Sequence, residues 1–233
     1  MAGTLKKRLE AWQRRLTERI GTDISTPEAR QAARVHYNFV DHGWLRVLWR
    51  NFHRVGHGVY RSNQPSGSQL HAIHAKVGLR TVLNLRGKSR QSFYLFESEA
   101  CRKLGLTLVD LPLSASQAPP LAGLEQLVTL LQTMEKPFLI HCKSGADRTG
   151  LAAALYLLLV EKQPIEMAKR QLSFRYIHVA KSPAGVQDHL LRVYEQAFRQ
   201  SGIGFLDWMR SAYDPAEVTA SFARWRAGDR SLT

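Results

Sequence analysis

The sequence has few cysteines, few acidic residues and no long hydrophobic run. Cys101 and Cys142 are its only cysteines in 233 residues, too few for a disulfide framework, so a reducing, cytosolic setting fits better. The longest apolar run, Leu151 to Val160, is ten residues, whereas crossing a bilayer takes about 20. It therefore predicts a buried helix. The charged N-terminus is not followed by an apolar segment, so we expect no signal peptide.

Acidic residues are scarce relative to basic ones. The sequence has 19 Asp and Glu against 33 Lys and Arg, which gives a formal net charge of +14. Residues 1–61 contain twelve of the basic and five of the acidic residues, and so half of the net charge. Such a chain favours anionic partners, namely nucleic acid, acidic lipid or a phosphorylated substrate. A high net charge also serves solubility alone.

Residues 1–52 are predicted to form a basic, amphipathic, helical extension. A helix is expected over residues 4–20, and a second begins at Thr26 and Pro27, a capping residue followed by proline at the first helical position. A third apolar cluster lies between Trp44 and Phe52 and is interleaved with arginines. Two interpretations stay open. The extension packs on the rest of the protein or on another subunit, or it makes peripheral contact with an anionic membrane.

From residue 53 onwards, strands and helices alternate. Residues 53–61 predict a short hairpin, and further strands are expected over 79–85, 106–111 and 137–141. Helices are expected over 66–77, 92–104, 121–135, 151–160, 164–174, 183–200, 203–212 and 215–225. We expect an α/β fold with a central, mainly parallel sheet flanked by helices, and helical N- and C-terminal extensions. The predicted central domain covers residues 53–202, and residues 203–233 form a C-terminal helical extension packed on it.

The most informative stretch joins the strand that ends at His141 to the long apolar helix. Cys142 and Arg148 enclose five residues, Lys143, Ser144, Gly145, Ala146 and Asp147. A loop of this kind can wrap an anion with its backbone N–H groups, with a helix N-terminus behind it. The anion would lie against the Cys142 sulfur. The pattern therefore predicts a phosphate-binding loop and a thiolate that attacks phosphorus.

The residues around Cys142 are suited to ionise it. The positive end of the following helix and the charge of Arg148 should lower its pKa from the ~8.5 of a free cysteine. His141 would order Cys142 through hydrogen bonds, and Thr149 could donate a hydrogen bond to the thiolate. Arg148 offers a bidentate fork to two phosphate oxygens.

The same stretch resembles a known family. The run from His141 to Gly150 matches the signature of cysteine-dependent protein tyrosine phosphatases, which is His-Cys, five residues, then Arg-Thr-Gly. Upstream, Val59 to Pro65 and Leu79 to Gly87 are similar to the compact, atypical dual-specificity branch of plants, fungi and bacteria. The resemblance covers residues 53–200. It implies a cytoplasmic phosphomonoester hydrolase with a phosphocysteine intermediate, and neither a metal nor another cofactor.

The resemblance also implies a general acid that protonates the leaving oxygen. In the superfamily this is usually an Asp on a loop upstream of the cysteine. Asp110 has a suitable separation, 32 residues before Cys142, but it lies inside an expected strand, and the loop over 114–120 has no carboxylate. Asp147 is the preferred candidate, because myotubularin-type and Sac-type lipid phosphatases have an Asp at this loop position. The alternative for Asp147 is a structural carboxylate paired with a neighbouring Lys or Arg.

Three functions stay open. A protein tyrosine or dual-specificity phosphatase acting on phosphorylated proteins is preferred. A phosphoinositide or other phospholipid phosphatase at a membrane surface is the main alternative, supported by Asp147, by Lys143 at the rim of the loop and by the basic N-terminus. An inactive phosphate-binding module is the third. Arg86 is expected to support the loop or a substrate, or to pair with Glu97 or Glu99. Nucleic acid is not expected as a partner, and the sequence does not predict the oligomeric state.

Overall fold

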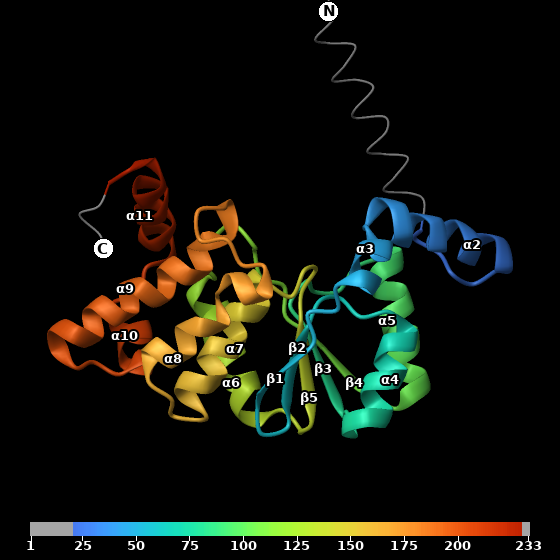
Figure 1. Ribbon diagram of the computed structural model, residues 1–233, viewed down its shortest axis with the longest axis horizontal. Helices are drawn as coiled ribbons and strands as arrows, with labels where there is room; N and C mark the ends of the chain where they lie inside the picture. Colours follow the sequence, from blue (N-terminus) through green and yellow to red (C-terminus); the bar gives the residue numbers. More distant parts are fainter. Residues whose placement is uncertain (1–20, 230–233) are drawn as a thin grey trace, which may run out of the picture.

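A five-stranded sheet forms the centre of the molecule (Figure 1). The computed structural model describes residues 21–229, so the helix expected over residues 4–20 lies outside the described residues. The sheet has the order β1-β2-β5-β3-β4, with β1 (His53–Gly56), β2 (Val59–Ser62), β3 (Thr81–Asn84), β4 (Thr107–Asp110) and β5 (Phe138–His141). Strand β1 pairs antiparallel with β2, and the other pairs are parallel. The predicted hairpin and the mainly parallel sheet are confirmed.

Helices cover both faces of this sheet (Figure 1). One face is covered by α4 (Gly67–Val77) and α5 (Ser92–Leu104), and the other by α6 (Leu121–Thr133), α7 (Asp147–Leu159), α8 (Ile165–Ala168) and α9 (Val186–Ser201). The chain reaches the sheet through α2 (Pro27–Val35), the π-helix η1 (His36–Val40) and α3 (Gly43–Leu48), and it leaves through α10 (Phe205–Ser211) and α11 (Pro215–Ala227). The predicted fold class is therefore confirmed.

The two faces follow from the alternation of side chains along β5. Phe138 and Ile140 point into the core beneath α6 and α7, and Leu139 points into the smaller core beneath α4 and α5. His141 comes two residues after Leu139 and so faces α5. Cys142 follows it and is buried in the core on the α7 side. The strand thus delivers a histidine to one face of the sheet and a cysteine to the other.

Helix α7 is the buried helix predicted from the apolar run. Nine of its thirteen residues are buried. It packs between the sheet and α9, as expected of a helix that is apolar on every side. Within residues 21–229, no helix combines the length and the apolar character that crossing a bilayer requires.

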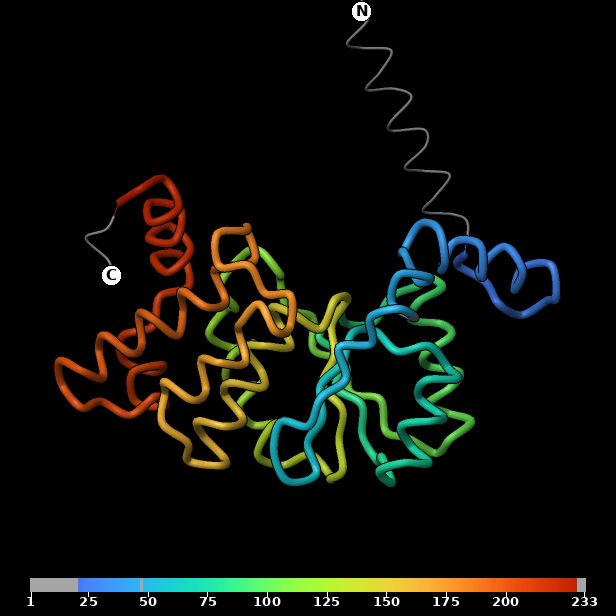
Figure 2. Tube along the Cα trace, viewed as in Figure 1, coloured from blue at the N-terminus to red at the C-terminus, as the bar shows by residue number. Residues whose placement is uncertain are grey.

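The N-terminal segment lies along α5 (Figure 2). The Thr26 hydroxyl caps α2, as its position before a proline predicts. Arg30 of α2 donates hydrogen bonds from both of its terminal nitrogens to the carboxylate of Glu99 in α5, at 2.8 and 2.9 Å. His36 Nδ1 lies 2.8 Å from Ser92 Oγ at the start of α5. Polar contacts therefore attach this segment to the rest of the protein.

The C-terminal helices extend the larger core. Trp208 of α10 and Phe222 and Trp225 of α11 are buried in the same cluster as α7 and α9. The Tyr213 hydroxyl, between the two helices, donates to the Pro119 carbonyl oxygen at 2.6 Å. These helices thus bury large aromatic side chains against the sheet domain. The division of the chain at residues 52 and 202 stays a prediction.

The single helix expected over residues 164–174 is wrong. Helix α8 ends after four residues, and the 3₁₀ turns η2 (Lys169–Gln171) and η3 (Phe174–Tyr176) take its place. Leu172 has a φ of −109° and a ψ of 68°, outside the helical region, so no helix continues through it. The Gln171 carbonyl beside it accepts a hydrogen bond from Nη1 of the buried Arg61, at 2.7 Å. A tertiary contact thus holds the chain at the point where it leaves the helical conformation.

Candidate active site

The loop between β5 and α7 lies at the carboxyl ends of the parallel strands. Strands β2, β3 and β5 are in register there, so Ser62, Asn84 and His141 lie side by side at the edge of the sheet. Ligands of open α/β sheets bind at this edge. Cys142 is the first residue after β5 and is 1% exposed, and Arg148 lies in the first turn of α7. The fold thus brings the two together around the backbone of residues 143–147.

Close packing against neighbouring segments explains the two glycines of this stretch. Gly145 has a φ of +72°, and a Cβ there would lie 2.4 Å from the Ser62 carbonyl oxygen. Only glycine adopts this conformation at this separation without strain. At Gly150 a Cβ would lie 2.6 Å from Leu172 Cδ2. The loop is therefore seated tightly between β2 and the turn after α8.

Backbone carbonyls orient Arg148. Its Nη1 donates to the carbonyl oxygens of Leu85 at 3.3 Å and Leu113 at 3.1 Å, just beyond β3 and β4. Its Nε is buried and has no hydrogen-bond partner among the described residues. Buried donors in proteins are nearly always satisfied. An anion in the loop would satisfy this one, because a guanidinium fork matches two phosphate oxygens.

The surroundings of Cys142 favour its thiolate. Burial alone would raise the pKa of Cys142, but the charge of Arg148 and the adjacent side chain and backbone N–H of Thr149 outweigh burial. The pKa of Cys142 therefore lies below its usual value, although the nearby charge of Asp147 opposes the shift. Cys101 provides a contrast, because burial raises its pKa to about 12. Of the two cysteines, Cys142 is the one whose surroundings favour the thiolate.

Arg61 of β2 supports the loop, a role that the sequence pattern did not predict. Its side chain is completely buried, and Nη2 donates to the Gly145 carbonyl oxygen at 2.7 Å. Its guanidinium carbon lies 3.8 Å from the centre of the Tyr176 ring. Burial lowers the pKa of Arg61 to about 10, so it is still a cation at neutral pH. The sequence feature that could have singled out Arg61 is its place inside a short strand, where charged side chains are rarely buried.

A chain of polar contacts leads away from the loop through His141. Its Nδ1 lies 3.3 Å from the Cys142 carbonyl oxygen, and its Nε2 lies 2.8 Å from Glu97 Oε1. Gln64 Nε2 donates to the other oxygen of Glu97 at 2.8 Å, and Gln64 Oε1 accepts from Arg86 at 2.8 Å. His141 therefore contacts the backbone of Cys142, and it is itself fixed from α5.

Asp41 ends this chain of contacts and gathers three cations. Its carboxylate lies 2.7 Å from Arg86, 2.7 Å from Arg46 and 3.5 Å from Lys143 of the loop. Burial alone would raise the pKa of Asp41, but the hydrogen bond from Arg86 and the charges of the three cations lower it below its usual value. An N-terminal carboxylate is thus electrostatically coupled to the loop.

The expected pairing of Arg86 with Glu97 or Glu99 is wrong. Glu97 is turned toward His141 on β5, and Glu99 toward α2. Arg86 follows β3 and reaches the N-terminal segment instead, where Asp41 accepts from both of its terminal nitrogens. Its guanidinium carbon also lies 3.4 Å from the centre of the Phe93 ring.

Substituting Asp41 by asparagine is expected to destabilise the fold by about 3 kcal/mol, because two buried arginines lose their counter-charge. Urea unfolding at pH 7 measures the effect. A carboxyl group with a lowered pKa stabilises the fold above its unfolded pKa, which is 3.8 for Asp41, and less as the pH falls. The difference should therefore persist down to about pH 4 and shrink as the pH falls through the lowered folded-state pKa.

The control is Glu135→Gln, which removes an exposed ion pair with Arg80. It should change the free energy of unfolding by less than about 1 kcal/mol. A loss at Asp41 no larger than that of the control would contradict the assigned role.

Asp147 contacts a partner that the sequence did not predict. Its Oδ1 lies 2.7 Å from Nδ1 of His178, which is 4% exposed, and the Asp147 side chain is 19% exposed. The alternative role of Asp147, a structural carboxylate, predicted an ion pair with a neighbouring Lys or Arg. Within residues 21–229 Asp147 forms no such pair. No described residue donates a hydrogen bond to Asp147 Oδ2. One oxygen is therefore fixed, and the other can meet a substrate.

Asp110 lies on the α5 side of the sheet. It comes two residues after Leu108, which packs on the core beneath α4 and α5, so it shares that face. Its Oδ1 accepts from Asn84 Nδ2 at 2.8 Å, and its Oδ2 accepts from the Tyr94 hydroxyl at 2.6 Å. Both oxygens are engaged. Asp110 is therefore less suited than Asp147 to transfer a proton to a leaving group.

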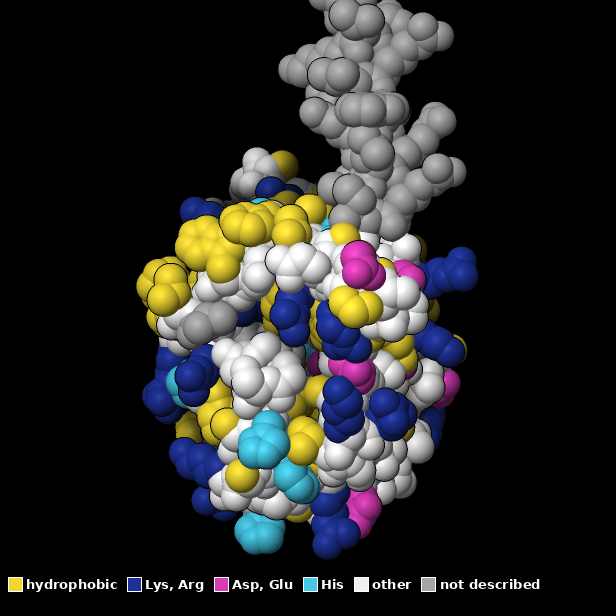
Figure 3. All heavy atoms as spheres, turned by 90° about the vertical axis from the view of Figure 1, so that its right-hand side faces the viewer, with side chains coloured by type: hydrophobic (Ala, Val, Ile, Leu, Met, Phe, Trp, Pro, Cys, Tyr) yellow, Lys and Arg dark blue, Asp and Glu magenta, His cyan; other side chains and the backbone are white. Residues whose placement is uncertain are grey.

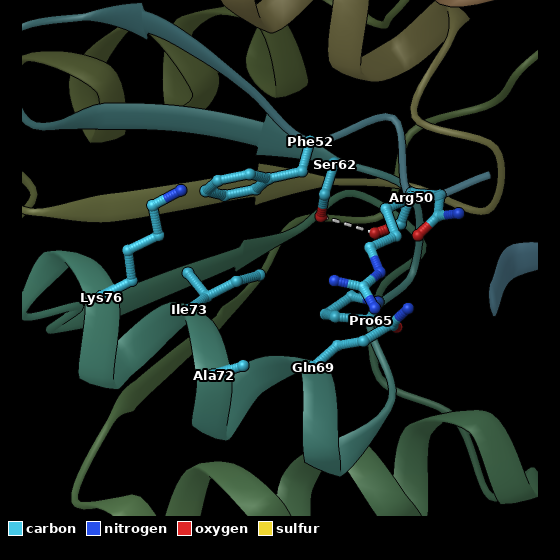
Figure 4. Close-up of a pocket in the computed structure, with 9 residues that line it drawn as sticks. Arg50, Phe52, Ser62, Pro65, Gln69, Ala72, Ile73 and Lys76 are labelled. Atoms are coloured by element: carbon cyan, nitrogen blue, oxygen red, sulfur yellow. Dashed lines mark hydrogen bonds between the residues drawn. The ribbon is translucent and has the colours of Figure 1, made fainter. Parts of the chain in front are cut away.

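A separate cavity of about 120 Å³ lies beside α4 (Figure 4). Its lining comes from α4 and from the chain around β1 and β2, and includes Arg50, Phe52, Ser62, Asn63, Ile73 and Lys76. Neither Cys142 nor Arg148 lines it. The Ser62 hydroxyl donates to the Asn63 carbonyl oxygen across the inner wall. In the described part of the chain, no three or more His, Cys, Asp or Glu side chains are grouped to hold a metal ion.

Comparison with known proteins points to the central part of the chain. A family model described as DSP-PTPase phosphatase fused to NAD+ kinase matches residues 53–187. Inositol diphosphatase DSP1 of Oryza sativa subsp. japonica is 35% identical over 105 residues, which are 43% of this chain and 46% of the relative. Dual specificity protein phosphatase TpbA of Pseudomonas aeruginosa is 29% identical over 113 residues, 48% of each protein. The chain thus spans about half the length of these curated relatives.

The fold has relatives among solved structures. The core catalytic domain of the PP-IP phosphatase SIW14 from S. cerevisiae matches with a TM-score of 0.53 and 18% identity, over 66% of this chain and 94% of that one. At this identity the likeness concerns the fold alone. The resemblance to compact dual-specificity phosphatases is confirmed by the family model, which spans more than half of the sequence. This chain belongs to the DSP-PTPase phosphatase family whose model is described as fused to NAD+ kinase.

Proposed function

We propose that the chain is a phosphomonoester hydrolase that works through a phosphocysteine intermediate, as a protein tyrosine or dual-specificity phosphatase. One observation carries the proposal. The buried Nε of Arg148 lacks a protein partner, and it belongs to the same loop as a cysteine whose pKa is lowered. A loop that ionises a thiol and keeps an arginine donor unsatisfied is suited to an oxyanion beside a nucleophile.

Each side chain has one role in the proposed reaction. Arg148 and the backbone N–H groups of the loop bind the phosphate oxygens, and the Cys142 thiolate attacks phosphorus opposite the leaving oxygen. Asp147 protonates that oxygen, then takes a proton from the water that breaks the phosphorus–sulfur bond. Thr149 stabilises the thiolate as it leaves. His178 holds Asp147 in position.

The proposed substrate class rests on the relatives and on the charge around the loop. The rice relative is named an inositol diphosphatase, and the Pseudomonas relative a dual specificity protein phosphatase. We favour phosphorylated proteins. Phosphorylated inositol, free or in a lipid headgroup, is the second candidate, because Lys143 adds a cation with a 45% exposed side chain to the loop. A reducing compartment such as the cytoplasm would keep both cysteines free.

One set of assays tests this proposal. The purified protein is given an aryl phosphate, a phosphotyrosine peptide, a soluble inositol polyphosphate and phosphoinositide vesicles, with the Cys142→Ser protein as the blank. Turnover of the first two supports the protein phosphatase, and turnover of inositol compounds alone selects the second candidate. Absence of turnover on all four would leave an inactive phosphate-binding module and defeat the proposal.

Substituting Asp147 by asparagine is expected to lower kcat/KM for phenyl phosphate about 10²- to 10³-fold, because its leaving oxygen needs a proton. The loss in kcat/KM should be much smaller for p-nitrophenyl phosphate, whose leaving group is stable as an anion. The pH–rate profile should also lose its basic limb, since that limb reports deprotonation of the acid.

Asp110→Asn is the matched control and should leave the profile and the dependence on leaving group unchanged. Unchanged turnover and an unchanged profile for Asp147→Asn would show that Asp147 is not the acid, and the reverse pattern would assign that role to Asp110.

A further inference from the structure

Exposed hydrophobic side chains are concentrated in two short segments. Among the side chains that the structure describes, twelve large hydrophobic ones are exposed, and ten of these belong to residues 35–49 or 174–179. The most exposed are Phe39, Leu48 and Phe174, at 70%, 78% and 81%. Soluble surfaces usually carry such side chains singly. We refer to residues 35–49 and 174–179 as the docking segments.

The docking segments flank the candidate active-site loop. Asn51, just after the first segment, donates from its side chain to the Ser144 carbonyl oxygen in the loop and to the Tyr176 carbonyl oxygen in the second segment, both at 3.1 Å. Figure 1 shows α3 and the stretch before α9 at the same end of the molecule, where β5 ends. Figure 3 shows hydrophobic side chains gathered at that end, near the top of the face it draws.

Both docking segments lie in stretches almost without carboxylates. Between Glu28 and Glu97 the only acidic residue is Asp41, which is buried and paired, against eleven Lys and Arg. Between Glu166 and Asp188 there are four basic residues and no acidic one. An apolar surface in stretches with an excess of cations complements an anionic lipid surface. A second copy of the chain would bring the same cations, so like charges oppose self-association through this face.

We infer that the docking segments form a peripheral membrane-binding face that rests on an anionic phospholipid bilayer. Trp44 and Trp49 are about half exposed, which suits the interfacial layer where amphipathic rings sit. Phe39, Leu48 and Phe174 are exposed enough to enter the bilayer below that layer. Lipid binding stands apart from the proposed function. Only the corollary, that the loop between the segments meets phosphorylated headgroups, rests on the phosphatase proposal.

Vesicle binding by the full chain tests the inference. Co-sedimentation is measured with phosphatidylcholine vesicles that contain or lack phosphatidylserine. We expect binding to the anionic vesicles that weakens as salt is added. The double variant Leu48→Ser/Phe174→Ser should lower the partition coefficient about tenfold, equivalent to about 1.4 kcal/mol. Phe198→Ser is the matched control, since Phe198 is 44% exposed but lies on α9, outside both segments.

Each other outcome overturns the inference. Equal binding of the double variant and the native chain would place lipid binding elsewhere, and equal binding to both vesicles would exclude charge complementarity. If the native chain does not bind anionic vesicles, the face belongs to another partner. The same holds if the native chain instead forms a dimer that the Leu48→Ser/Phe174→Ser substitutions dissociate. Every variant should retain aryl phosphate turnover. If the native chain shows no aryl phosphate turnover, the proposed function is wrong, but the vesicle-binding result still holds.

Discussion

Replacing Cys142 with serine is expected to abolish turnover of every substrate, with a loss in kcat on the order of 10⁵-fold or more. A hydroxyl ionises far less readily than a thiol, and the loop that lowers the pKa of Cys142 cannot close that gap. The two side chains have nearly the same shape, so the variant should fold normally. It should also still bind inorganic phosphate, because Arg148 and the loop backbone are unchanged. Calorimetry and steady-state kinetics measure the two properties separately.

The pH dependence of the Cys142 thiol supplies an independent measurement. Because its pKa is lowered, the midpoint of alkylation by iodoacetate should lie below 9.0, and kcat/KM should fall as the pH drops through the same pKa. Cys101 is an internal control, since burial raises its pKa to about 12 and the Cys142→Ser protein should resist alkylation near neutral pH. A midpoint at or above 9.0, or residual turnover in the serine variant, would refute the role of Cys142.

Lysine at position 148 is expected to lower kcat/KM about 10³-fold, although the positive charge is kept. Arg148 is oriented by the carbonyl oxygens of Leu85 and Leu113, which leaves its remaining donors to grip two phosphate oxygens. A lysine offers one ammonium group and cannot reproduce both sets of contacts.

The pKa of Cys142 separates the two contributions of Arg148. Arg148→Lys should shift it little, whereas Arg148→Ala should raise it, because the arginine charge is the largest factor that lowers it. Arg90→Lys, at an exposed arginine outside the loop, is the matched control and should change neither property. Activity of Arg148→Lys within tenfold of the native chain would show that charge alone suffices.

Most of the fold could be predicted because it follows from local patterns. Helix α5 begins and ends where its periodicity predicts, and Gly105, at a φ of +67°, closes it. Strands β3, β4 and β5 lie within the predicted apolar runs and are one to three residues shorter, whereas β2 extends one residue past the predicted hairpin. The helix expected over residues 164–174 ends early, and the chain leaves the helical conformation at Leu172, beside the Gln171 carbonyl that Arg61 binds from 110 positions away. A contact between such distant positions leaves no trace in the local pattern.

The candidate site divides in the same way. The placement of Cys142 against Arg148 follows from a single stretch of ten residues whose glycines could be recognised directly, although α7 begins at Asp147, four residues before the apolar run that predicted it. The partner of Asp147 could not, because His178 lies 31 positions further along, in an irregular segment. Arg61 and Asp41 come from two other elements, and only the folded chain brings them to the loop. The catalytic roles themselves stay predictions until the variants are measured.

We expect that the family-matched region, residues 53–187, would not fold stably without the rest of this chain. A cut at residue 52 would remove Asp41 and leave Arg86 without its counter-charge. A cut after residue 187 would strip the larger core of the aromatic side chains of α10 and α11. In descendants of this chain, a change at Asp41 should therefore survive only beside a compensating change at Arg86 or Arg46. Among related sequences, substitutions at these three positions should then be correlated, although Asp41 and Arg46 lie outside the matched region.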